Sequence, residues 1–160
     1  IAPSFLVHKV IYVDNFKGAK TFFKYIDDIK AFVEENKAYN KKVDISFYGI
    51  DYNQPLNIEK VDMVISQFAD FVGQASKKYL KKNGIILCND SHGDATLAYL
   101  DIDYNFIGVI NQNNAIDRNH LSEYFKFKRN RPIDLEHVKK TMKGPKYKKQ
   151  AKSYLFQLIH

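Results

Sequence analysis

The stretch VDMVISQFADFVGQASKKYLKKNGIILCND, residues 61–90, decides the predicted fold. Its two short apolar runs, residues 61–66 and 85–88, are typical of buried strands. Between these runs, apolar side chains recur at helical spacing: Phe68, Phe71, Val72, Ala75 and Tyr79. The pair Asn83-Gly84 is typical of a helix end. The stretch therefore predicts a strand, a helix and a second strand, the unit from which parallel sheets are built.

The rest of the chain predicts further strands around this unit. Residues 8–13 and 43–50 are predicted strands, separated by a helix over 18–36 with one apolar face. Residues 104–110 and 153–159 are predicted strands that pair antiparallel at one edge. We therefore expect an α/β, Rossmann-like fold: a mostly parallel sheet with helices on both faces and an antiparallel C-terminal edge pair.

The length of 160 residues predicts a single domain, with a basic insertion at about 118–152. The one cysteine, Cys88, lies in an apolar run, so no internal disulfide can form and a cytoplasmic setting is expected. No apolar run is long enough to span a membrane. The chain begins with Ile1 rather than Met, and the strand spacing fits a sheet entered at its second strand. Either the first strand lies upstream, or the fold has lost the strand that would carry the cofactor.

The net charge of +7 is concentrated at the C-terminus. Residues 118–160 hold 12 Lys and Arg against three acidic residues, whereas the rest holds 13 against 15. This asymmetry predicts a nucleic acid or other polyanion as a partner, and the alternative is a solvated Lys-rich surface. The expected anion-binding residues are Lys126, Lys128, Arg129, Arg131, Lys146 and Lys148. Neighbouring aromatic residues could stack on unpaired bases: Tyr124, Phe125, Phe127 and Tyr147.

Polar residues follow each predicted strand. They are Asp14-Asn15, Asp51-Tyr52-Asn53, Ser66-Gln67 and Asn89-Asp90. In open parallel sheets, ligands bind beyond the carboxyl ends of the strands. A carboxylate there can accept hydrogen bonds from a ribose diol or an adenine amino group, so these ends predict a nucleoside-containing ligand. The alternative is that strand ends are polar because loops are polar.

The segments VDMVISQFADF and SKKYLKKNGIILCND resemble the second half of class I S-adenosylmethionine-dependent methyltransferases. In that family the fourth strand begins with D-hydrophobic-V and ends at the active site, as Asp62–Ser66 would. A helix ending in L-K-x-G-G precedes the fifth strand, similar to Leu80–Gly84. The resemblance covers most of the chain, with residues 104–110 and 153–159 corresponding to the family's antiparallel edge.

The resemblance implies S-adenosylmethionine as the cofactor. It implies cofactor contacts from the strand ends: Asp14 and Asn15 at the ribose, Asp51 and Tyr52 near the adenine, and Ser66. The expected catalytic residues border the methyl-transfer site: Ser66, Gln67, Asn89 and Asp90.

Two family motifs are absent from the sequence. There is no acidic residue followed by G-x-G, since Gly18 is the first glycine. No D/N-P-P-Y/F sequence stands at residues 66–69, which argues against an adenine- or cytosine-amino DNA methyltransferase. The sequence therefore predicts a methyltransferase-like domain, a fragment or degenerate form, that acts on a nucleic acid or other anionic substrate.

Two other functions stay open. One is a non-catalytic binding or assembly module of the same fold, in which the basic segment holds a partner. The other is a metal-dependent phosphoesterase, because Asp90-Ser91-His92-Gly93 is similar to the D-x-H-G metal motif of calcineurin-like enzymes. His92 is better explained as a loop histidine that hydrogen-bonds its neighbours than as a metal ligand, and no metal ligands are assigned.

Overall fold

The computed structural model describes residues 1–160, which group into two compact units, residues 1–56 and 57–160. Each unit has a hydrophobic core of its own. The two units are described separately.

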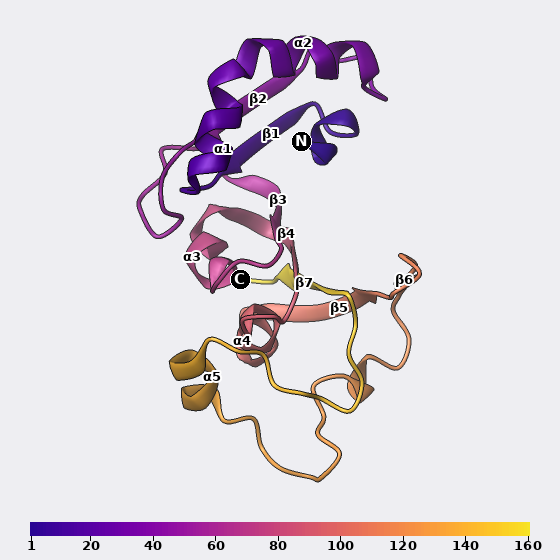
Figure 1. Ribbon diagram of the computed structural model, residues 1–160. Coiled ribbons are helices and arrows are strands. Elements are labelled where there is room, and N and C mark those ends of the chain that lie inside the picture. Colours follow the sequence, from indigo (N-terminus) through magenta and orange to yellow (C-terminus); the bar gives the residue numbers. More distant parts are fainter. The chain divides into compact units, whose positions relative to one another are not determined.

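The first unit is a two-stranded parallel sheet with helices (Figure 1). Its elements are η1 (Ala2–Phe5), β1 (Lys9–Val13), α1 (Lys17–Phe22), η2 (Phe23–Tyr25), α2 (Ile26–Asn36) and β2 (Asp44–Tyr48). β1 pairs with β2 from Lys9↔Asp44 to Val13↔Tyr48, so both strands end at the same edge. The core joins α2 to β2 through Ile29, Val33, Val43 and Ile45. The predicted helix over 18–36 is thus present but interrupted by a 3₁₀ turn.

The second unit contains a five-stranded sheet and three short α-helices. Its elements are β3 (Val61–Ser66), α3 (Val72–Ser76), η3 (Lys77–Tyr79), β4 (Leu80–Cys88), α4 (Asp94–Leu100), β5 (Tyr104–Ile110), β6 (Ile116–Asp117), η4 (Leu121–Glu123), α5 (Leu135–Thr141) and β7 (Ser153–Leu158). The strand order is β3-β4-β7-β5-β6.

The prediction of a Rossmann-like, mostly parallel sheet is wrong. The main sheet is curled, three of its four strand pairings are antiparallel, and β1 and β2 form a separate sheet. The last strand, β7, lies between β4 and β5 and pairs antiparallel with both (Figure 1). β4 and β5 run in the same direction, but β7 separates them. The expected antiparallel pairing of the last two strands is present, although β7 is interior rather than at the edge.

The helix predicted between the strands of residues 61–90 is much shorter than expected. α3 has five residues and one 3₁₀ turn follows it, so these elements cannot cover a sheet face as a long crossover helix would. Leu80–Gly84, which resembles a helix end, belongs to β4 instead. The ammonium of Lys81 there lies 2.9 Å from the Asp62 carboxylate on β3, and Gln157 on β7 donates to the Asn83 carbonyl. Cross-strand partners therefore override the local helical spacing.

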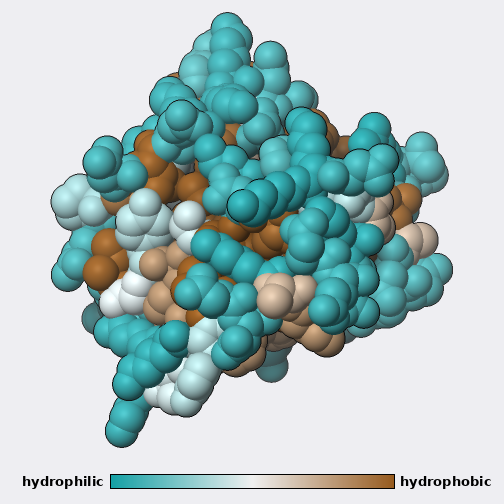
Figure 2. Space-filling model, turned by 90° about the horizontal axis from the view of Figure 1, so that it is seen from above, coloured by the Kyte–Doolittle hydropathy of each residue, from teal (hydrophilic) through white to brown (hydrophobic).

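Aromatic side chains fill the core of the second unit. Phe156 on β7 is fully buried and lies near Phe106 and Tyr104 of β5, with ring centroids 5.1 and 6.4 Å away. Phe125 packs into the same cluster from the basic segment. The face in Figure 2 is mostly hydrophilic, with apolar side chains in scattered patches. No helix is both long and apolar enough to cross a membrane.

Truncating Phe156 tests whether this aromatic cluster holds the second unit together. We expect Phe156→Ala to lower the free energy of unfolding by about 3–5 kcal/mol, since it empties a fully buried ring site. Urea unfolding monitored by circular dichroism measures the loss. Ile102→Ala is the control, because Ile102 is 87% exposed and should change stability little. A loss below about 1 kcal/mol for Phe156→Ala would contradict this packing.

Candidate functional site

The four predicted catalytic residues lie together at one edge of the sheet. β3 and β4 pair in parallel with Ser66 opposite Cys88, so the residues that follow both strands meet there. The Gln67 Oε1 atom accepts hydrogen bonds from Asn89 Nδ2 at 3.4 Å and from Ser153 Oγ at 3.2 Å. Gln67 is exposed, whereas Ser66 and Asn89 are buried. Ser153, the first residue of β7, is a member of this group that the sequence analysis missed.

Asp94 is a buried carboxylate beneath this edge. Its side chain is 1% exposed and accepts hydrogen bonds from Ser66 Oγ at 3.0 Å and from the Gly73 backbone N–H at 3.0–3.1 Å. Burial raises its pKa to about 7, and these hydrogen bonds oppose the rise. The Ser66 hydroxyl is committed to Asp94, so Ser66 is a structural residue here.

Asp90 holds the basic segment through Thr96. Its carboxylate accepts hydrogen bonds from the Thr96 backbone N–H at 2.7 Å and from Thr96 Oγ1 at 2.8 Å. Because the threonine hydroxyl has one proton, Tyr147 OH donates in turn to Thr96 Oγ1, at 2.9 Å. Burial raises the pKa of Asp90 to about 6. Asp90, Thr96 of α4 and Tyr147 are thus joined in one chain of hydrogen bonds.

These contacts make the loop after β4 a buried polar network. Asn89 Oδ1 accepts a hydrogen bond from Ser91 Oγ at 2.8 Å, so Asn89 also has a partner within the loop. Carboxylates with pKa values near neutrality can exchange protons, and such groups mark candidate functional sites. One feature of the sequence could have identified Asp94 and Thr96. Both lie at the start of an apolar segment, ATLA, where a buried polar side chain needs an internal hydrogen-bond partner.

The predicted cofactor residues of the first unit also lie together. Asp14 and Asn15 follow β1, Asp51 follows β2, and Asn15 Nδ2 lies 3.4 Å from Asp51 Oδ2. Asp14 Oδ1 accepts from the Phe16 N–H, and Asp51 Oδ1 accepts from Asn53. Tyr52 is half-buried beside them. A carboxylate has about four acceptor positions, so Asp14 and Asp51 retain capacity for hydroxyl or amino donors.

These residues fit part of an S-adenosyl nucleoside. Acceptor oxygens at the ends of two parallel strands suit ribose hydroxyls and an adenine amino group, and both carboxylates keep free acceptor positions. Ser66 does not fit, because its hydroxyl is buried against Asp94. The residues that would hold the nucleoside are therefore Asp14, Asn15 and Asp51.

The basic segment, residues 118–152, exposes its cations and buries most of its aromatic rings. Tyr124, Phe125 and Tyr147 are at most 6% exposed, so they cannot stack on bases. All six predicted anion-binding residues are exposed: Lys126, Lys128, Arg129, Arg131, Lys146 and Lys148. Arg131 and Lys146 line one hollow together. The structure thus favours contacts to phosphate over contacts to bases in this segment.

His92 is a loop histidine with polar neighbours. Its Nδ1 atom lies 3.0 Å from Ser91 Oγ, and its Nε2 atom lies 4.0 Å from Asp70 Oδ1. No group of three or more His, Cys, Asp or Glu side chains is placed to hold a metal ion. The geometry gives the phosphoesterase alternative no support.

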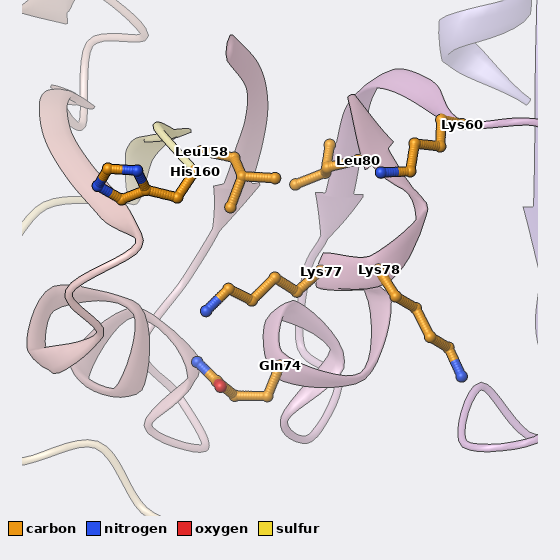
Figure 3. A pocket seen from close by; sticks show the side chains of 7 residues that line it. All are labelled: Lys60, Gln74, Lys77, Lys78, Leu80, Leu158 and His160. Atoms are coloured by element: carbon orange, nitrogen blue, oxygen red, sulfur yellow. The ribbon is translucent and has the colours of Figure 1, made fainter. Parts of the chain in front are cut away.

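A separate hollow of about 380 Å³ lies between η3 and the end of β7 (Figure 3). Three lysines line it, with Gln74, Leu80, Leu158 and His160. The ammonium of Lys77, the most central of them, lies 2.7 Å from Asp101 and 5.4 Å from the centre of the Tyr104 ring. Because Asp101 and Asp103 balance the charge of Lys77, two unpaired lysines remain and this hollow is a weaker anion site.

Comparisons with known protein families and with curated proteins found no match for this chain.

The buried carboxylates predict an unusual pH dependence of stability. The ordinary carboxyl pKa is 3.8, and the folded-state value for Asp94 is about 7, so the folded chain retains a proton that the unfolded chain releases. The free energy of unfolding should therefore fall between about pH 4 and pH 7 and then level off. In Asp94→Asn this fall should shrink, because an amide does not titrate in this range.

Urea unfolding over this pH range measures the effect. Asp27→Asn is the control, because Asp27 is an exposed carboxylate on α2. An unchanged pH slope in Asp94→Asn would show that Asp94 titrates normally.

Proposed function

We propose that the chain is methyltransferase-like and that its first unit binds the nucleoside part of S-adenosylmethionine. The observation that carries this proposal is the parallel pairing of β1 and β2, which sets Asp14, Asn15 and Asp51 at one edge. There the Asp14 carboxylate would accept hydrogen bonds from the ribose hydroxyls, and Asp51 would accept from the adenine amino group. S-adenosylmethionine supplies an activated methyl group when it is bound.

The second unit, taken by itself, supports the same proposal. The resemblance implies that the fourth and fifth strands of the family lead to the active-site edge, and β3 and β4 are parallel neighbours that end together. It also implies an antiparallel pair at the end of the chain, and β5 and β7 form one. The exposed Gln67 amide marks the edge where a substrate group would be oriented, with Asn89 and Ser153 fixing its rotamer.

Calorimetric titration with S-adenosylhomocysteine tests the nucleoside site. We expect binding to the wild type and at least a tenfold weaker affinity in Asp14→Ala and Asp51→Ala, because each substitution removes a charged hydrogen-bond acceptor. Asp44→Ala is the matched control, since Asp44 is an exposed carboxylate at the opposite end of β2. Absence of heat with the wild type, or equal losses in all three variants, would overturn the proposal.

A second candidate function is a binding module for a polyanion. The observation that favours it is that the basic segment buries most of its aromatic side chains and exposes its cations. The buried rings anchor the backbone, and the cations face solvent. Such an arrangement favours nucleic acid or another phosphate polymer as the partner, held through backbone charge. This function needs no cofactor and can be tested without one.

Salt dependence tests the polyanion candidate. The affinity for a fluorescein-labelled single-stranded oligodeoxynucleotide should fall linearly on a logarithmic salt scale, with a slope of about −0.7 per phosphate contact. Fluorescence anisotropy measures it. In Lys126→Ala/Lys128→Ala the slope should be shallower than in the wild type. Affinity that does not change with salt would contradict a charge-driven interface.

A further inference from the structure

A hollow of about 810 Å³ lies between the segment 127–132, α5 and the turn that follows α5. Its charged or titratable lining residues are Arg131, Asp134, His137, Lys143 and Lys146. They come from three consecutive pieces of the basic segment. The hollow is distinct from the strand-end network and from the lysine-lined hollow beside β7.

Arg131 is the oriented cation of this hollow. Its guanidinium lies 4.1 Å from the centre of the Phe127 ring, within the range of a cation–π contact. The Phe127 ring also packs at 5.0 Å from the buried Tyr147 ring. A guanidinium held over a packed ring still presents its N–H donors in the plane of its own fork, which suits the oxygens of a phosphate group.

The charge of the hollow is positive. Arg131, Lys143 and Lys146 stand against one carboxylate, Asp134. Asp134 caps α5, with its Oδ1 accepting a hydrogen bond from the His137 N–H at 2.9 Å. No carboxylate lies within 4.0 Å of the three cations. Their charges are therefore free to meet an anion.

The walls of the hollow are fixed to the loop after β4. A Cβ atom on Gly144 would lie 1.7 Å from the Asp90 carbonyl oxygen, and the Gly144 N–H donates to the Ser91 carbonyl. A Cβ atom on Gly93 would lie 2.5 Å from Val138 of α5. These close approaches hold α5 and its following turn in place, so the cations of the hollow sit on a constrained backbone.

We propose that this hollow is a phosphate-binding site for a phosphate monoester or phosphodiester, in which Arg131 forms the bidentate contact. Lys143 and Lys146 supply the flanking charge. The site recognises phosphate rather than bases, because Phe127 is covered by Arg131 and the other rings are buried. The proposal rests on the polyanion-binding candidate and names the residues that carry it.

The experiment uses the full chain and two probes, glycerol 3-phosphate and a fluorescein-labelled single-stranded oligodeoxynucleotide. The first offers a monoester and the second offers phosphodiesters. We expect Arg131→Ala to weaken binding of the recognised probe about tenfold, a loss typical of a bidentate charged contact. Arg129→Ala is the matched control, because Arg129 is an exposed arginine two residues away that does not line the hollow. It should weaken binding about threefold or less.

Arg131→Lys separates geometry from charge. It keeps the positive charge but loses the planar fork, so we expect it to restore less than half of the lost binding free energy. Circular dichroism checks that each variant is folded, and Arg131 is exposed enough for its removal to leave the core intact.

Each outcome bears on the proposal. A selective loss with one probe supports the site and identifies monoester or phosphodiester as its ligand. Equal losses of affinity in Arg129→Ala and Arg131→Ala would overturn the proposed phosphate site in the hollow. They would still be consistent with a diffuse polyanion-binding surface. Wild-type affinity in Arg131→Lys would overturn the bidentate contact. Binding of neither probe by the wild type would overturn the hollow and the polyanion candidate together.

Discussion

The second unit depends on two carboxylates, half-buried Asp90 in the loop after β4 and buried Asp94 at the start of α4. Asp94 ties β3 to α3 by accepting from Ser66 and Gly73, and Asp90 ties α4 to Tyr147 through Thr96. A buried carboxylate is tolerated only when hydrogen bonds replace its lost water. The donors to Asp94 come from β3 and α3 and those to Asp90 from α4, so the cost of burying the carboxylates is offset only in the assembled fold.

The same loop determines where the basic segment lies. Gly93 and Gly144 allow the backbone of the loop and the turn after α5 to approach closely, and Tyr147 brings the far end of the segment back to Thr96. A long segment with few regular elements is thereby constrained at several points. That constraint is what gives exposed cations a defined hollow rather than a diffuse surface.

The two proposed ligands belong to different units and stand independently. Carboxylates at the end of β1 and β2 provide acceptors for a nucleoside, whereas cations around α5 provide donors for phosphate. The loop that resembles a metal motif serves neither ligand directly. Its polar residues hydrogen-bond to one another and to α4.

The sequence by itself determined the strands β1, β2, β3, β5 and β7 and the position of the polar strand ends, because strand periodicity and loop polarity are local properties. It did not determine the strand order or the extent of β4. Those depend on β7 pairing with residues about 70 positions earlier, a contact that no local pattern encodes. The burial of Asp94 and of the aromatic rings was also decided only by the tertiary structure. In the sequence, a carboxylate or an aromatic ring looks the same whether it is exposed to a ligand or enclosed by its neighbours.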